Sequence, residues 1–250
     1  MKAMVFAAGL GTRLKPLTDS MPKALVPVAG KPLLQHTIEK LKASGFNEVI
    51  INVHHFANQI IDFMRRNDNF GIRIEFSNES EKLLDTGGGI KRASWFFNDG
   101  QPFLIHNVDI LSNIDLCELM KQHRESNSAA TLVCGERETS RYLLFDRSNR
   151  LRGWVNEKTG EEKSPVAHRN PSRYKKLAFS GIHLLQPSLF KQMEEMADTF
   201  SIIDFYIQHC DEVAITLYAP KGLQTIDVGR LEALPAAELF VNQLTLISPK

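Results

Sequence analysis

KAMVFAAGLGTR, residues 2–13, is the stretch that decides the fold. Its apolar first half predicts a β-strand over residues 2–7, and Gly9 and Gly11 directly after the strand predict a tight turn. A strand followed by small residues lets successive backbone N–H groups point at an anion. Phosphate binding is one interpretation of this loop. A plain turn, which needs the same residues, is the other.

Two common phosphate loops do not match this stretch. The dinucleotide fingerprint needs a third glycine at position 14, where the chain has Leu14, and a Walker A loop needs a Gly-Lys-Ser/Thr that does not follow. More than twenty residues separate the strand from the next predicted helix, with three prolines between them. The loop is therefore expected to be long and to wrap around a ligand, with Arg13 and Lys23 supplying positive charge.

Strand and helix patterns alternate through the first hundred residues, which predicts an α/β protein with a Rossmann-like, doubly wound sheet. The predicted strands are residues 2–7, 48–53, 72–77 and 103–105. Helices are expected from Pro32 to Gly45, after residue 53 and after the glycines 87–89. In such sheets the first and fourth strands lie side by side at the switch point, where ligands bind. The glycine loop and Asp109 should then face one crevice.

The second half of the chain predicts a partly antiparallel extension of the sheet. Strands are expected at residues 129–133, 142–146, 151–156, 177–185 and 213–218, and helices at 187–196 and 228–240. No linker or internal repeat marks a second independent domain. We therefore expect a single domain over residues 1–250.

Composition limits the classes of partner. The chain has 250 residues, 43% of them hydrophobic, and a formal net charge of +1. A near-neutral chain is not expected to bind nucleic acid or an anionic membrane, so a small molecule is the expected partner. No apolar run approaches the length of a membrane span or a signal peptide, which predicts a cytoplasmic protein. The three cysteines are far apart and are expected to be free thiols.

The motif around the glycine loop resembles a known family. Residues 7–18, AAGLGTRLKPLT, followed by residues 22–28, PKALVPV, are similar to the signature of the nucleoside-diphosphate-sugar pyrophosphorylases, also called sugar nucleotidyltransferases. Within that family the chain most resembles the short uridylyltransferases that act on N-acetylmuramate 1-phosphate in cell-wall recycling. Most of the residues that match the family pattern lie before residue 112, and few lie after it.

The resemblance implies a division of the domain as well as a fold. The fold would be the GT-A-like nucleotidyltransferase fold of the family. Its nucleotide-binding half would cover residues 1–128 and its sugar-binding half residues 129–228, with a C-terminal helix and tail over residues 229–250.

The resemblance implies roles for the residues of the first half. The phosphates of a nucleoside triphosphate would lie on the backbone of Ala8, Gly9, Gly11 and Thr12. Arg13 would neutralise the leaving pyrophosphate, and Lys23 would lie near the α-phosphate. The predicted catalytic residues are therefore Arg13, Lys23 and Asp109. The segment Thr86-Gly87-Gly88 corresponds to the family's contact with base and ribose. A plain loop before a helix is the alternative for that segment.

The resemblance also implies a magnesium site and a sugar site. Asp109 and Asp227 match the family's two metal aspartates and would hold Mg²⁺, although either could instead be a helix cap. A valine, Val108, stands where relatives commonly have glycine, which puts the metal geometry in question. The predicted sugar contacts are Asn107, Glu157, Lys158, Ser180 and Gly181. An ordinary charged hairpin turn is nearly as good an explanation for Glu157 and Lys158.

The expected reaction is transfer of a nucleotidyl group from a nucleoside triphosphate, expected to be UTP, to a sugar 1-phosphate. The protein is expected to be a monomer or a homodimer. Other members of the class would act on mannose 1-phosphate with GTP, on glucose 1-phosphate, or on phosphocholine. A protein of another class, a non-catalytic nucleotide-sugar sensor, would not need the two aspartates. The basic stretch 163–176, with His168, Arg169 and Arg173, is interpreted as a solvated loop or as a partner for a substrate carboxylate.

Overall fold

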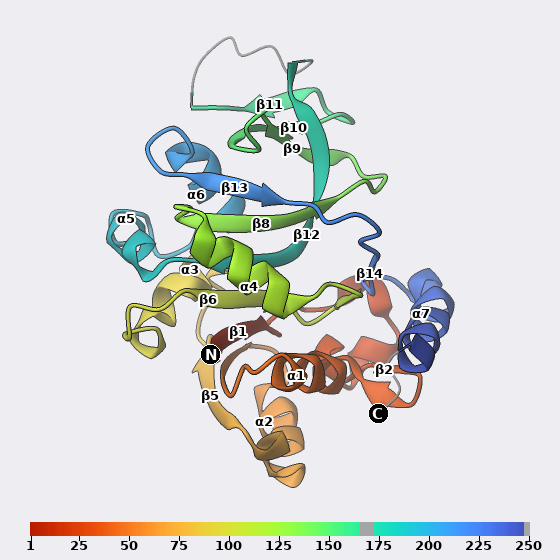
Figure 1. Ribbon diagram of the computed structural model, residues 1–250. Coiled ribbons are helices and arrows are strands. Elements are labelled where there is room, and N and C mark those ends of the chain that lie inside the picture. The colour runs from red at the N-terminus through yellow and green to blue at the C-terminus, as the bar shows by residue number, and fades with distance from the viewer. Residues whose placement is uncertain (166–172, 248–250) are drawn as a thin grey trace. The chain divides into compact units, whose positions relative to one another are not determined.

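The computed structural model describes residues 1–165 and 173–247 (Figure 1). Two compact units make up the chain, and neither is continuous in sequence. Unit 1 comprises Met1–Leu83, Ile105–Cys117 and Gln224–Lys250, and unit 2 comprises Leu84–Leu104 and Glu118–Leu223. Each unit is described in turn.

The sheet of unit 1 has the strand order β6-β1-β4-β5. Strands β1 (Lys2–Phe6), β4 (Glu48–Val53) and β5 (Arg73–Asn78) are parallel neighbours, with Lys2 opposite Glu48 and Glu48 opposite Arg73. Strand β6 (Phe103–Asn107) ends beside β1. The α/β class and the pairing of the first and fourth predicted strands are confirmed. Near-continuous burial along β1 and β4 is what a parallel sheet covered by helices requires.

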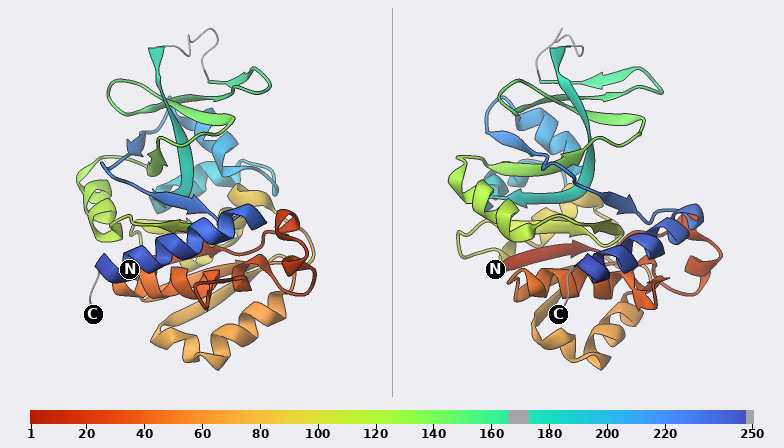
Figure 2. Two further views of the ribbon diagram at one scale, coloured as in Figure 1. Left: turned by 90° about the vertical axis from the view of Figure 1, so that its right-hand side faces the viewer. Right: turned by 45° about the vertical axis from the view of Figure 1, so that its right-hand side comes forward.

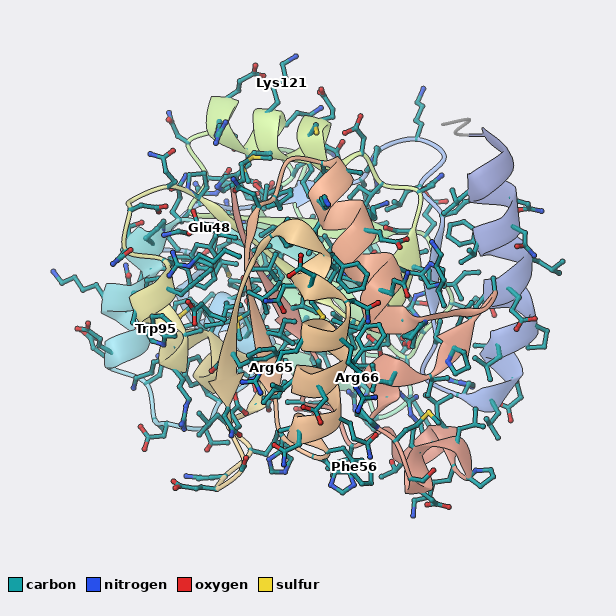
Figure 3. All side chains as sticks on the ribbon, turned by 90° about the horizontal axis from the view of Figure 1, so that it is seen from below. Glu48, Phe56, Arg65, Arg66, Trp95 and Lys121 are labelled. Carbon is teal, nitrogen blue, oxygen red and sulfur yellow. The ribbon has the colours of Figure 1, made fainter. Side chains whose placement is uncertain are left out.

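Two helices connect these strands and lie side by side (Figures 2 and 3). Helix α1 (Leu33–Ala43) lies within the predicted helix and buries one face, made of Leu33, Leu34, Thr37, Ile38 and Leu41. Helix α2 (Ala57–Arg66) buries Ile60 and Met64, and its last residues Arg65 and Arg66 are exposed. Both helices join parallel neighbours in the same direction along the sheet, so right-handed crossovers put them on one face.

Between β1 and α1 the chain forms three short 3₁₀ turns and a small hairpin. The turns are η1 (Thr12–Leu14), η2 (Leu17–Asp19) and η3 (Lys23–Leu25), and the hairpin pairs β2 (Pro27–Val28) with β3 (Lys31–Pro32). The predicted long loop is thus built from compact turns. A further turn, η4 (Asp68–Gly71), follows α2.

The end of the chain returns to unit 1. Strand β7 (Ile110–Ser112) pairs antiparallel with β14 (Thr225–Asp227), and Asp227 lies opposite Ile110. After the turn η8 (Leu231–Ala233), helix α7 (Leu234–Ile247) runs alongside α1 (Figure 2). The predicted helix 228–240 began too early, because the chain stays extended through Arg230 and Pro235 suits only the first turn of a helix.

Unit 2 contains a mixed group of strands. These are β8 (Ala130–Gly135), β9 (Arg141–Phe145), β10 (Leu151–Asn156), β11 (Glu161–Lys163), β12 (Lys175–Leu185) and β13 (Ile215–Tyr218). The pairs β8–β12, β9–β12, β9–β10 and β10–β11 are antiparallel, and β8–β13 is parallel. The predicted partly antiparallel extension is confirmed.

Among residues 1–165 and 173–247, the remaining helical segments are α3 (Asp85–Arg92), η5 (Ser94–Phe96), α4 (Leu116–Glu125), η7 (Pro187–Leu189), α5 (Phe190–Glu194) and α6 (Ile202–His209). Gly87, Gly88 and Gly89 lie inside α3, which corrects the prediction of a helix that begins after them. Sequence patterns did not predict α4 or α6. Among the described residues, no helix has the length and apolar character that a membrane crossing requires.

Candidate functional site

The glycine loop folds back on itself at Gly11. This glycine has a left-handed backbone, φ 64°, and a β-carbon added to it would lie 2.9 Å from Thr18 Cγ2. The Thr18 hydroxyl donates a 2.8 Å hydrogen bond to the Gly11 carbonyl. Gly9 differs, because a β-carbon added to it would have no described heavy atom within 4 Å outside its chain neighbours. The turn conformation explains why residue 11 is a glycine. At Gly9 no described heavy atom fills the space for a β-carbon, and we call this side of the loop its open face.

Lys23 is buried against this turn. Only 8% of the residue is exposed, and its β-carbon lies 3.1 Å from the place that a β-carbon of Gly11 would take. Its Nζ donates to Asp109 Oδ2, which joins two segments 86 residues apart in the sequence. A buried ammonium group needs an anionic partner, so this ion pair explains how the lysine is tolerated there. Lys23 is therefore no solvated surface lysine.

Two strands bring the predicted metal aspartates together. Asp109 directly precedes β7, and Asp227 ends β14, opposite Ile110. The Val228 backbone N–H donates a 2.9 Å hydrogen bond to the carbonyl of Asp109. Neither aspartate begins a helix, which excludes the helix-cap alternative for both. The two carboxylates come from segments more than a hundred residues apart and flank the same strand pair.

Val108 fits its position as part of the core. It is 4% exposed, its N–H donates to the Phe6 carbonyl at 3.1 Å, and its φ is not in the left-handed region. The backbone beside Asp109 therefore needs no glycine. This removes the reason for questioning the position of Asp109.

Asp227 has an unused buried oxygen. Its Oδ1 is buried and has no hydrogen-bond partner among the described residues. A β-carbon built on Gly229 would lie 2.7 Å from this oxygen and 2.9 Å from Arg13 Nη2. Any other residue at position 229 would displace the carboxylate or the guanidinium. Gly229, which the sequence analysis did not single out, makes room for both charged groups.

A buried polar pair supports the start of the loop. Asn52, at the end of β4, donates from Nδ2 to the carboxylate of Glu79, which is 1% exposed. The Asn52 carbonyl also accepts a 3.1 Å hydrogen bond from the Ala7 N–H. Sequence patterns gave no signal for this pair, because a single Asn inside a strand and a single Glu after another strand form no motif.

In unit 2, the segment Thr86-Gly87-Gly88 packs within the protein. A β-carbon on Gly87 would lie 2.2 Å from the Phe200 ring, and one on Gly88 would lie 2.1 Å from the Asp198 carbonyl. The Gly87 N–H donates to the Phe200 carbonyl at 2.9 Å. Close packing thus explains these two glycines without a ligand, and their contact with the nucleotide stays a prediction.

The predicted sugar residues lie on several elements. Asn107 ends β6 in unit 1. Ser180 is buried in β12 of unit 2, beside Gly181 at an irregularity in its pairing with β8. Glu157 and Lys158 are exposed in the turn between β10 and β11. Their sugar contacts remain predictions.

The charged residues near this turn already have partners. Glu157 accepts from Lys176 Nζ at 2.8 Å, and Lys163 Nζ donates to Asp204 at 2.8 Å. Lys163 and Lys176 are the first and last residues of the basic stretch 163–176. Their ion pairs at the surface agree with the interpretation of a solvated segment. His168 and Arg169 lie outside the described residues.

The charged groups of unit 1 fit a magnesium ion. Mg²⁺ in proteins is usually held by one or two carboxylates, with phosphates and water completing its ligands. Asp109 and Asp227 supply two carboxylates, and the buried Oδ1 of Asp227, unpartnered within the described chain, is a free ligand atom. No group of three or more His, Cys, Asp or Glu side chains suited to a metal occurs among the described residues. A metal that arrives together with phosphates needs no such group.

Fold and site together define a class: an α/β protein with a glycine loop after its first strand, a buried lysine and two acidic residues beside a short strand pair. Comparison identifies the family. Residues 2–243 match the family model for nucleotidyl transferases, and the chain belongs to this family. It is 30% identical over 256 residues to an N-acetylmuramate alpha-1-phosphate uridylyltransferase of Caulobacter vibrioides, covering 94% of this chain and 95% of that one.

A second N-acetylmuramate alpha-1-phosphate uridylyltransferase, from Neisseria meningitidis serogroup B, is 45% identical over 115 residues, which cover 46% of this chain and 49% of that protein. The chain thus spans about half the length of this relative, and 37% of a Synechocystis UTP–glucose-1-phosphate uridylyltransferase. Among solved structures, a UDP-glucose pyrophosphorylase complexed with UDP-glucose matches with a TM-score of 0.76 at 17% identity, covering 97% and 98% of the chains. That likeness supports the fold.

Proposed function

We propose that the protein transfers a uridylyl group from UTP to N-acetylmuramate 1-phosphate, giving UDP-N-acetylmuramate and pyrophosphate. The observation that carries the reaction type is the approach, in unit 1, of two cations to two carboxylates: Lys23 pairs with Asp109, and Arg13 Nη2 and Asp227 Oδ1 both lie beside Gly229. The two N-acetylmuramate uridylyltransferases among the relatives support the choice of substrates. In a cell this reaction belongs to cell-wall recycling in the cytoplasm, where nucleoside triphosphates are available.

The reaction is an in-line displacement. An oxygen of the sugar 1-phosphate attacks the α-phosphorus of the triphosphate, a new P–O bond forms, and the bond to the β-phosphate oxygen breaks. Pyrophosphate leaves with that electron pair. No residue has to remove a proton, because the attacking phosphate is already ionised at neutral pH. Catalysis then consists mainly of positioning and of stabilising negative charge.

Each residue of the site has a place in this scheme. The backbone around Gly9, Gly11 and Thr12 would hold the phosphates, and Arg13 would offset the charge of the leaving pyrophosphate. Lys23 is buried, and a fixed charge in a water-poor position would act strongly on the α-phosphate. Asp109 and Asp227 would hold Mg²⁺, which offsets the repulsion between the two polyanions when bound. Thr86, Gly87 and Gly88 are proposed to contact the base and ribose.

The sugar would contact Asn107, Glu157, Lys158, Ser180 and Gly181. Glu157 is exposed and accepts a hydrogen bond from Lys176, so it would exchange this partner for a sugar hydroxyl. Ser180 is buried, and a buried hydroxyl next to a glycine suits hydrogen bonding to a sugar.

Asp109→Asn tests the proposed reaction. The substitution keeps the size of the side chain and removes its charge, so pyrophosphate release from UTP with N-acetylmuramate 1-phosphate should fall by about a thousandfold or more. Circular dichroism and thermal unfolding should show a folded protein. Asp115→Asn, which changes another aspartate of unit 1 just beyond β7, is the matched control and should keep its activity.

A substrate panel separates the alternatives. UTP, GTP, CTP and dTTP are each combined with N-acetylmuramate 1-phosphate, glucose 1-phosphate, mannose 1-phosphate and phosphocholine. The proposal requires the highest kcat/KM for UTP with N-acetylmuramate 1-phosphate. Wild-type pyrophosphate release by Asp109→Asn would refute the metal assignment, and no release from any pair, as a sensor requires, would refute the proposed reaction.

A further inference from the structure

A cavity lies in unit 1 between α1, β7 and α7. Its volume is about 500 Å³, within the range of small-molecule sites. The residues that carry the argument are Lys40, His106, Ile110, Ser112, Val241 and Leu244, all of which line it. Arg13, Lys23, Asp109 and Asp227 are not among the described residues of its wall. The cavity is therefore separate from the proposed reaction site.

His106 lines this cavity and carries a buried hydrogen-bond acceptor. The residue is 1% exposed, and its Nδ1 lies 2.8 Å from the carbonyl oxygen of Asn107. Burial lowers the pKa of His106 to about 4, so the ring is neutral near pH 7. A carbonyl oxygen can only accept, so Nδ1 carries the hydrogen and Nε2 is a bare acceptor. This Nε2 is buried without a partner among the described residues, and a ligand hydroxyl would satisfy it.

Lys40 supplies the cavity wall with a positive charge for an anion. Its Nζ donates one hydrogen bond, 2.7 Å, to the Ser112 carbonyl and has two further N–H groups. Burial lowers the pKa of Lys40 to about 8, with Asp115 opposing the shift, so the side chain is mostly charged at pH 7. Glu39, also on the wall, is held by Lys31 and Gln35. One lysine matches one negative charge, which favours a carboxylate over a doubly charged phosphate.

We propose that this cavity binds a hydroxylated organic acid, with the carboxylate on Lys40 Nζ, a hydroxyl donating to His106 Nε2, and the carbon chain against Ile110, Val241 and Leu244. The cavity wall supplies each element that such a ligand needs: a cation, an acceptor and an apolar surface. An apolar compound would leave the two polar groups unsatisfied, and an uncharged polyol would not use Lys40.

A ligand in this cavity is positioned to act on the proposed reaction site through strand β7. Ile110 and Ser112 belong to β7, which directly follows Asp109 and pairs with the strand that ends at Asp227. A ligand that holds β7 in one position therefore acts on the backbone of both aspartates. This regulatory part rests on the proposed function, whereas binding to the cavity does not.

Binding is tested with a matched six-carbon series. Gluconate has the carboxylate and the hydroxyls, hexanoate has only the carboxylate, and sorbitol has only the hydroxyls; glycerate and lactate extend the hydroxy acids to shorter chains. Saturation-transfer NMR and isothermal titration calorimetry report binding directly. At least one hydroxy acid should bind with a Kd below about 1 mM, and hexanoate and sorbitol should bind about tenfold more weakly than gluconate or not at all.

Variants locate the site. Lys40→Met and His106→Asn should each weaken hydroxy-acid binding by about tenfold. His106→Gln, which places a polar atom near the Nε2 position, should restore part of it. Lys42→Met is the control on α1, because Lys42 donates to the Phe70 carbonyl and does not line the cavity. If a variant fails to fold, Leu244→Trp fills the cavity from the half-buried face of α7 and should also abolish binding.

The outcomes separate binding from catalysis. No hydroxy acid binding to the wild type, equal binding of hexanoate or sorbitol, or loss of binding in Lys42→Met but not in Lys40→Met would each overturn the proposal. Pyrophosphate release is then measured with and without the bound acid. An inactive protein that still binds the acid through Lys40 and His106 refutes the proposed function and leaves the second site standing.

Discussion

At the scale of single residues, two glycines of the same loop carry different constraints. Gly11 has a left-handed backbone and lies against Thr18, so another residue there strains the turn. Gly9 has open space where a β-carbon would be. A glycine that the fold itself does not require is best explained by close approach of a ligand to the backbone.

Alanine substitutions distinguish the two glycines. Gly11→Ala should lower the free energy of unfolding by about 2 kcal/mol, from the left-handed backbone and the contact with Thr18. Gly9→Ala should change it by less than about 0.5 kcal/mol. The KM for UTP should nevertheless rise about tenfold or more in Gly9→Ala, because the methyl group occupies the space of the phosphates. Urea unfolding and steady-state kinetics measure both quantities, and an unchanged KM in Gly9→Ala argues against phosphate binding at this face.

Part of this site could be named from the sequence. The glycine loop is a local pattern, and resemblance to the family's motifs pointed to Lys23, Asp109 and Asp227. Two features escaped: the buried pair of Asn52 with Glu79, and the space left by Gly229. Both depend on which segments meet in three dimensions, and neither leaves a local pattern.

At the scale of elements, helix α3 shows how packing overrides propensity. Three consecutive glycines disfavour a helix by about 1 kcal/mol each relative to alanine, which is why sequence reasoning placed them before it. In the structure, α3 lies so close to Phe200 and Asp198 that a β-carbon does not fit. Packing at this short distance stabilises a helix that its sequence alone does not favour. Strands β7 and β14 escaped prediction because each has only three residues.

Gly88→Ala tests this explanation. Helix propensity alone predicts a gain of about 1 kcal/mol in the free energy of unfolding. A β-carbon 2.1 Å from the Asp198 carbonyl oxygen instead forces the backbone apart, and a net loss of about 2 kcal/mol or more is expected. Chemical denaturation of wild type and variant decides the sign, and a gain in stability would show that propensity outweighs the close packing.

At the scale of the whole molecule, buried neutral histidines make stability depend on pH. His123 is fully buried, its Nδ1 lies 2.7 Å from the Thr131 hydroxyl, and burial lowers its pKa to about 4. His106 has the same value. In the unfolded chain both histidines take up a proton near pH 6.5. Between pH 6.5 and 4 the unfolded state therefore binds more protons than the folded state, and stability falls as the pH is lowered.

The expected loss between pH 7 and pH 5 is about 2 kcal/mol for each of these histidines. His123→Gln should remove its share of this slope, whereas His55→Gln, at an exposed position, should leave the slope as in the wild type. Urea denaturation at pH 7, 6 and 5 measures the three proteins. Equal slopes for wild type and His123→Gln would contradict the assignment of a buried neutral ring.

The pairing of β7 with β14 has a consequence for the order in which the protein is made. A ribosome synthesises residues 1–83 of unit 1 first, then most of unit 2, and only then the segment from Gln224 onward. Domains that are continuous in sequence can fold as they emerge, but unit 1 cannot finish until its last segment arrives. A nascent chain that stops before Gln224 carries the glycine loop, Lys23 and Asp109 but lacks Asp227. Interrupted translation therefore leaves products in which the proposed metal site is never assembled.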